Sequence, residues 1–272
     1  MADTHLNLFY PYGARDREGG LLEDNLTRAL VHTIKLLSEE HRAAFLDALF
    51  SRARHLMYLD RTPDGDELAS IPATDFRRAD VALQDRIPNK HNPKHANYGD
   101  DSRRRVVTIS SGHSPKKLSG EKPKDSRPDA WIFDREGASF CLLLECKYGD
   151  NPVEEHQIRR HGAEWFGKKA WKMEKEGSWD RDIAPDLLDL TWYDVLEATK
   201  AATKEIDRES EDAAAPVGRN ELEKQILLEL HHFIGFYGYW RFVGFRFSEL
   251  RRRPEWRLCR LGSLNVAEGK KP

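Results

Sequence analysis

Residues 127–147, RPDAWIFDREGASFCLLLECK, decide the expected fold. Two runs rich in apolar residues, 129–134 and 139–147, flank a turn-like stretch at 135–138, so a strand-turn-strand unit is predicted. The second run is almost uninterrupted from Phe140 to Leu144, which is typical of a central strand buried on both faces.

The buried run ends in Glu145-Cys146-Lys147, and two charges that leave a core strand must be paired, hydrated or bound to a metal. Side chains alternate along a strand, so Glu145 and Lys147 share one face. Asp129 precedes Glu145 by 16 positions (145 − 129) and reaches the same face if the hairpin register allows it. Two carboxylates beside an ammonium group predict a divalent-cation site, whereas the simpler alternative is a solvated pair of little energetic worth.

This segment resembles the PD-(D/E)XK nuclease superfamily, and the matching residues are Pro128-Asp129 and Glu145-Cys146-Lys147. The resemblance covers roughly residues 20 to 200. It implies a restriction-endonuclease-like α/β sandwich, in which helices flank a central mixed β-sheet.

Two further residues support the resemblance. Members of the superfamily often carry a glutamate on the first core helix, and Glu23 is the best candidate here, with Asp24 as the alternative. Several branches place a glutamine on the helix after the Glu-x-Lys strand, which matches Gln157, and His161 stands where an aromatic residue often follows. Gln157 would orient a carboxylate or contact a substrate phosphate. Each residue also has a simpler interpretation: Glu23 as an acidic group that favours a helix start, Gln157 as a solvated helix position, and His161 as a ring that stacks on a neighbour or lies at the surface.

The expected chemistry is hydrolysis of a phosphodiester bond with a divalent cation as cofactor. Asp129 and Glu145 are assigned as ligands, and oxygen ligands favour Mg²⁺ or Mn²⁺. The resemblance adds the backbone carbonyl of Cys146, and Glu23 for a second metal or its water shell. Lys147 would orient or help to deprotonate the attacking water. Repulsion among these carboxylates predicts that the pKa of one of them is raised without metal.

The pattern of apolar residues predicts the remaining elements. Helices are expected at 21–37, 39–59, 151–172, 193–209 and 220–236, the last capped by Asn220. Further strands are expected at 79–83, 105–110, 186–192, 239–247 and 256–261, with a flexible link at 209–217. We expect a nuclease core over 1–210, with its N-terminal helices, and a C-terminal helix with aromatic-rich strands over 211–272 that pack on the same domain.

Two basic regions are candidate substrate surfaces. The stretch from residue 103 to residue 124 holds seven basic residues against one acid, and it could follow a phosphate backbone: Arg103, Arg104, Arg105, Lys116, Lys117, Lys122 and Lys124. An ordinary solvated loop is the alternative. Arginines alternate with aromatic residues over 240–260, which fits strands with an aromatic core face better than a base-stacking surface. His91, His95 and His113 lack zinc-site spacing and are expected to face solvent.

Amino-acid composition argues against a highly basic nucleic-acid-binding protein, a membrane protein and a secreted protein. The chain has 272 residues, 44 Lys and Arg against 46 Asp and Glu, so binding to nucleic acid must come from local patches. No apolar run is long enough for a membrane span or a secretory signal. Three cysteines, an odd number without metal-ligand spacing, predict reduced thiols and a cytoplasmic location.

The leading hypothesis is therefore a metal-dependent nuclease (a hydrolase, with endonuclease or exonuclease action left open) that acts on DNA. These residues do not distinguish DNA from RNA. Family analogy suggests antiviral host defence or DNA processing. The alternative is a non-cleaving nucleic-acid-binding or scaffold subunit of a larger complex. A homodimer or an activating partner protein is compatible with either hypothesis.

Overall fold

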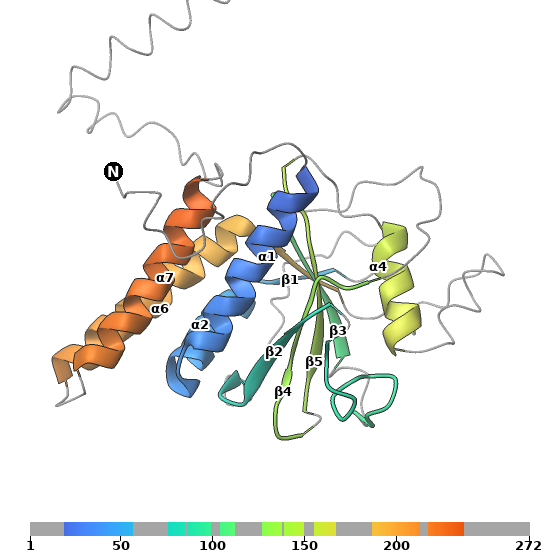
Figure 1. Cartoon of the computed structure of the whole chain (residues 1–272), viewed down its shortest axis with the longest axis horizontal. Helices are drawn as coiled ribbons and strands as arrows, with labels where there is room; N and C mark the ends of the chain where they lie inside the picture. The colour runs from blue at the N-terminus through green and yellow to red at the C-terminus, as the bar shows by residue number, and fades with distance from the viewer. Residues whose placement is uncertain are drawn as a thin grey trace, which may run out of the picture. The chain divides into compact units, whose positions relative to one another are not determined.

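The computed structural model describes residues 19–56, 76–84, 86–98, 104–111, 127–137, 139–149, 155–166, 187–212 and 217–236. These residues form a six-stranded mixed β-sheet with helices against both faces (Figure 1), which confirms the predicted α/β class. The chain divides into two compact units, 1–239 and 240–272, and all the described residues belong to the first. The helix expected at 220–236 therefore belongs to the same unit as the core, and the expected strands at 239–247 and 256–261 lie outside the described residues.

Three parallel strands form the centre of the sheet. The strands are β1 (Arg54–Leu56), β2 (Ala79–Leu83), β3 (Arg104–Ser110), β4 (Ala130–Asp134), β5 (Cys141–Cys146) and β6 (Leu187–Thr191), in the order β1-β6-β3-β5-β4-β2. β3 lies between β5 and β6 and is parallel to both, whereas β1, β4 and β2 join antiparallel. The hairpin of β4 and β5 is the strand-turn-strand unit predicted from residues 127–147.

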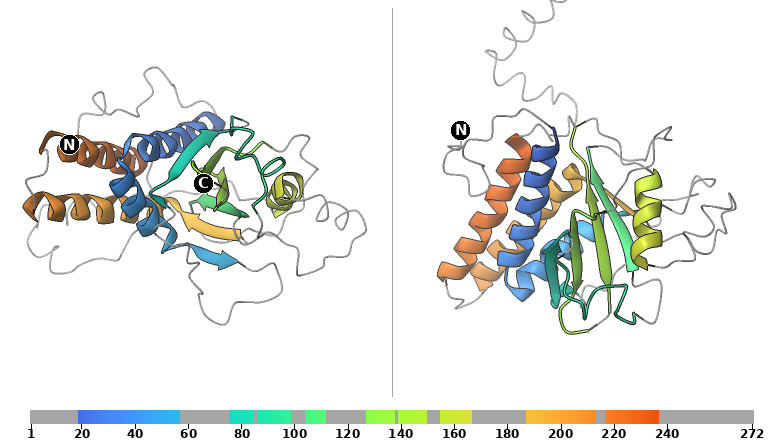
Figure 2. Two further views of the ribbon diagram at one scale, coloured as in Figure 1. Left: turned by 90° about the horizontal axis from the view of Figure 1, so that it is seen from below. Right: turned by 45° about the vertical axis from the view of Figure 1, so that its right-hand side comes forward.

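The helices form two unequal layers (Figure 2). One face of the sheet carries α1 (Gly19–Leu36), α2 (Glu39–Phe50), α6 (Trp192–Asp212) and α7 (Val217–Phe236). The other face carries α4 (Glu155–His161), which continues as the π-helical segment η3 (Gly162–Phe166).

Strand β5 contributes alternate side chains to two hydrophobic cores. Leu142, Leu144 and Cys146 pack in the core beneath the four long helices, whereas Cys141 and Leu143 pack in the smaller core beneath α4. Both cysteines are buried free thiols, and burial raises the pKa of Cys141 to about 12. This alternation places Glu145, the next odd position, on the α4 side.

Several predicted boundaries were wrong. The helix expected to extend to residue 59 ends at Phe50, and the next three amides bond back to helix carbonyls, Ala53 N to Phe50 O at 3.1 Å among them. Residues 54–56 instead pair with β6. α1 begins at Gly19, so Glu23 lies beyond its first turn.

Three further predictions were wrong: the helix cap at Asn220, the flexible link at 209–217 in its first residues, and the exposure of His91. Asn220 lies within α7 rather than at its cap, and α6 extends to Asp212, into the stretch expected to be a flexible link. His91 is buried rather than solvent-facing, because its ring packs against Phe133 at a centroid distance of 4.7 Å. His95 is exposed as expected, whereas His113 lies outside the described residues.

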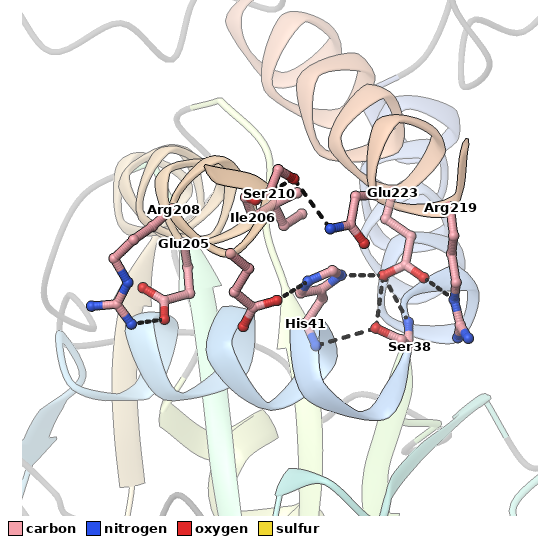
Figure 3. A network of polar contacts seen from close by, with 10 residues as sticks. Ser38, His41, Glu205, Ile206, Arg208, Ser210, Arg219 and Glu223 are labelled. Atoms are coloured by element: carbon pink, nitrogen blue, oxygen red, sulfur yellow. Dashed lines mark hydrogen bonds and ion pairs between the residues drawn. The ribbon is translucent and has the colours of Figure 1, made fainter. Parts of the chain in front are cut away.

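A buried polar network joins three helices of the larger layer (Figure 3). Glu223 of α7 accepts hydrogen bonds from the Ser38 amide (3.1 Å), the Ser38 hydroxyl (2.8 Å) and Arg219 Nε (2.8 Å). His41 of α2 contacts Glu223 through Nδ1 at 2.5 Å and Glu209 of α6 through Nε2 at 3.0 Å. Each ring nitrogen of His41 therefore faces a different carboxylate. The network therefore ties the start of α2 to α6 and α7.

Asp134 holds the turn between β4 and β5. Its buried carboxylate accepts hydrogen bonds from the amides of Glu136 (3.1 Å) and Ser139 (3.3 Å) and from the Ser139 hydroxyl (2.7 Å). We expect Asp134→Ala to lower the free energy of unfolding by about 1–3 kcal/mol, because three partly buried hydrogen bonds lose their buried acceptor. Urea denaturation measures this loss, and Glu136→Ala, at an exposed position of the same turn, is the control. Equal stability of the two variants would contradict the assigned role.

This stabilisation should depend on pH. Burial raises the pKa of Asp134, but the hydrogen bonds from Ser139 and Glu136 and the charge of Arg78 lower it more, so the folded-state pKa is below its usual value. A carboxylate with a lowered pKa stabilises the fold above its unfolded pKa of about 4, and this contribution is lost as the pH falls through the folded pKa. The difference between wild type and Asp134→Ala should therefore be larger at pH 6 than at pH 2.

Candidate functional site

Polar side chains converge on the α4 face at the carboxyl ends of the three parallel strands. Thr108 of β3 is in register with Glu145 of β5 on one side and with Asp189 of β6 on the other. Paired residues of neighbouring strands point to the same face, so these three side chains form one row across the sheet. The carboxyl ends of parallel strands are where open α/β sheets bind ligands.

Glu145 is the most buried carboxylate of this row. Its side chain is 1 % exposed, and three partners surround it, one that directly follows β5 and two from α4: Lys147 Nζ at 2.5 Å from Oε1, Gln157 Nε2 at 2.5 Å from Oε1, and His161 Nε2 at 2.9 Å from Oε2. The structure thus brings together Glu145, Lys147 and Gln157 as predicted, and adds His161.

The protonation state of Glu145 follows from these partners. Burial by itself raises the pKa of Glu145, but the hydrogen bond from His161 and the positive charge of Lys147 lower it more, so the net pKa lies below its usual range. Glu145 is therefore not the carboxylate whose pKa is raised, because its hydrogen bonds and the charge of Lys147 outweigh desolvation. Glu145 is a buried carboxylate held in its charged form.

Asp129 lies beside the end of β5. The ladder between β4 and β5 ends with the pair Ala130–Leu144, and the amide of Asp129, one residue before that pair, donates to Leu144 O at 3.1 Å. Its Oδ2 accepts the Cys146 amide at 2.7 Å. The backbone of Cys146 therefore already fixes one oxygen of the Asp129 carboxylate.

Lys147 is held at the end of β5 by its backbone. Its amide donates to Ile109 O at 2.8 Å, and its carbonyl accepts the indole N–H of Trp192 at 2.8 Å. These bonds fix the backbone of the Glu-x-Lys segment between β3 and the start of α6. The ammonium group is largely buried, with 13 % of its side chain exposed.

Asp189 and Thr108 were not singled out from the sequence. The Thr108 hydroxyl donates to Asp189 Oδ1 at 2.8 Å, and both side chains are buried. A signal was available: Asp189 interrupts the apolar run of β6 (Leu187–Thr191), and a lone acid in a buried strand needs a partner for the same reason that Glu145 does.

The remaining predicted site residues either lie at the other end of β3 or fall outside the described residues. Arg104 and Arg105 stand at the start of β3, paired with Cys141 and Leu142, whereas Thr108 pairs with Glu145. At about 3.3 Å per residue, Arg104 is roughly 13 Å along the strand from Thr108. Neither the side chain of Glu23 nor any part of Arg103, Lys116, Lys117, Lys122 and Lys124 is among the described residues.

The candidate ligands for a metal ion are the carboxylates of Asp129 and Glu145. Across the described parts of the chain, no three His, Cys, Asp or Glu side chains converge as a metal-binding group. Mg²⁺ commonly uses only one or two carboxylates and keeps several waters. A carboxylate offers about four acceptor positions, and the three contacts to Glu145 use three of them. Asp129 and Glu145, with the Cys146 carbonyl, would hold the ion.

No protein-family model matches this chain, and neither a curated protein nor a solved structure is significantly similar to it. None of the described helices is both long enough and apolar enough to cross a membrane.

Proposed function

We propose that this protein is a Mg²⁺-dependent nuclease with a restriction-endonuclease-like fold. The observation that supports this proposal is the contact of the buried Glu145 carboxylate with Lys147 at the carboxyl ends of parallel strands, next to Asp129, which accepts the amide of the intervening Cys146. A buried carboxylate held in its charged form next to an ammonium group suits a site that binds a cation and an anionic substrate together.

Each site residue has a separate task in this proposal. A bound Mg²⁺ would neutralise phosphate charge and acidify a water molecule. Asp129 and Glu145 hold the cation, and Gln157 fixes the orientation of Glu145 through Oε1. Lys147 orients the attacking water and offsets negative charge on the phosphate in the transition state.

DNA is the proposed substrate, and host defence or DNA processing in the cytoplasm is the proposed setting. The near-neutral net charge of −2 means that a local basic surface must bind the phosphate backbone. Arg104 and Arg105, together with the basic residues of 103–124 that the structure does not describe, are the proposed surface.

One observation favours a second candidate function, a nucleic-acid-binding scaffold that does not cleave. Lys147, Gln157 and His161 already surround Glu145, as they would in a purely structural ion-pair cluster. A scaffold of this kind binds DNA with or without divalent cations and leaves it intact.

Cleavage assays distinguish these functions. Circular and linear DNA, single- and double-stranded, and RNA are incubated with the protein in Mg²⁺, Mn²⁺ or EDTA. We expect Mg²⁺-dependent cleavage that Lys147→Met reduces about 10²-fold, since one positioned acid-base group contributes at least that factor. Opening of circular DNA would identify endonuclease action.

Lys94→Met is the matched control, because Lys94 pairs with Glu164 and covers the Trp165 ring, outside the predicted site. Equal loss of activity in both lysine variants would argue against a specific role for Lys147. Binding of DNA without cleavage in any metal would favour the scaffold.

A further inference from the structure

α4 presents two residues, one helical turn apart, to the same carboxylate. Gln157 reaches Oε1 of Glu145 and His161 reaches Oε2, so each oxygen has a partner from the helix. Residues four apart lie on the same side of an α-helix. Two contacts to two different oxygens fix the plane of the carboxylate, which one contact would leave free to rotate.

Hydrophobic packing holds α4 against the sheet, so the positions of Gln157 and His161 are fixed relative to Glu145. Ile158 and Trp165 pack in the smaller core, and the Trp165 ring meets Trp131 of β4 edge-on at a centroid distance of 5.0 Å. His161 is the last residue of α4 before the π-helical segment, and it is fully buried. A completely buried imidazole aimed at a charged carboxylate is more than a surface position of the helix.

From this geometry we propose that His161 is a positioning residue for the metal ligand Glu145. Its Nε2–H holds Oε2, while Lys147 and Gln157 hold Oε1, and one acceptor position of the carboxylate is left for the cation. The inference rests on the proposed function, because it assigns His161 a role in that same site. Groups that orient a metal ligand typically change metal affinity 10- to 100-fold when they are removed.

Three variants of His161 separate its hydrogen bond from its bulk. In His161→Gln the amide nitrogen replaces Nε2 and retains the donor, whereas the shorter side chain of His161→Asn does not reach Oε2. His161→Phe is a second variant without a donor and keeps a ring of similar size, so the test does not depend on the folding of one protein. The free energy of unfolding without metal is measured for each variant to establish that it is folded.

The primary measurement is the dissociation constant for Mn²⁺, by calorimetry and by the Mn²⁺-dependent rise in Tm of the full chain. We expect Mn²⁺ binding about 10- to 100-fold weaker in His161→Asn and His161→Phe. His161→Gln should stay within a few-fold of wild type. This pattern would support positioning, because a purely structural role would change the Tm without metal but not the affinity for Mn²⁺.

Two outcomes would overturn the inference in distinguishable ways. Folded Asn or Phe variants that bind Mn²⁺ as tightly as wild type would remove the role of His161 and leave the proposed nuclease intact. A wild-type protein that neither binds Mn²⁺ nor cleaves nucleic acid would overturn both proposals.

Discussion

Replacement of Asp129 by Asn should lower the rate of Mg²⁺-dependent DNA cleavage by about 10³-fold or more, because it removes a charged ligand of the proposed cation. Substitutions that only disturb the orientation of a ligand already cost 10- to 100-fold. The fold should survive the change, since the amide side chain of the Asp129→Asn variant retains an oxygen for the Cys146 amide, which Asp129 accepts at 2.7 Å. Single-turnover rates on linear DNA measure the effect, and urea denaturation shows that the variant is folded.

Asp80→Asn is the matched control. Asp80 lies in β2 of the same sheet, and its Oδ1 also accepts a backbone amide, that of Val81 at 2.8 Å. The control should retain nearly full activity. Cleavage by Asp129→Asn at the rate of the control would exclude Asp129 as a ligand.

The second large effect concerns stability rather than chemistry. Glu223→Ala should lower the free energy of unfolding by about 3–5 kcal/mol, because removal of one partner from a buried charged network leaves the others uncompensated. Ser38 would lose its acceptor, His41 would lose the partner of its Nδ1, and the start of α2 would lose its link to α7. Burial raises the pKa of Glu223, but its hydrogen bonds from Arg219, Ser38 and His41 lower it more, consistent with a charged carboxylate in the folded protein.

Urea denaturation near pH 7 measures this loss. Glu221→Ala, an exposed position on the same helix, should stay within about 0.5 kcal/mol of wild type. A loss for Glu223→Ala no larger than that of Glu221→Ala would mean that the network of Figure 3 does not stabilise the helical layer.

Local sequence predicted the elements that have strong periodicity. The strands at 79–83, 105–110 and 186–192 and the hairpin at 129–147 were placed to within about two residues. β1 was missed because three residues carry too little periodicity to separate them from the end of a helix. The strand order was not predicted, since nothing local in β3 encodes its place between two strands that follow it in the chain.

In the candidate site too, local sequence predicted some features, whereas others depend on how the elements pack together. Alternation along β5 predicted that Glu145 and Lys147 share a face, and the spacing of Gln157 suggested its approach. The contact of His161 with Glu145 depends on where α4 docks, which is a tertiary property. Asp189 reaches the same row only because β6 pairs with β3, so its place beside Thr108 required the topology.

The position of β3 has a consequence for the newly synthesised chain. In the described sheet, β3 lies between β5 and β6, and both of these strands are synthesised after it. β3 therefore has a partner on each edge only after residue 191 has been made. At roughly 5–20 residues per second, the segment Val106-Val107-Thr108-Ile109 waits several seconds as an unpaired apolar strand. Charged residues that flank such a strand discourage aggregation, and Arg104 and Arg105 stand directly before it. The two arginines thus stand where positive charge would oppose aggregation of the unpaired strand, whether or not they contact nucleic acid.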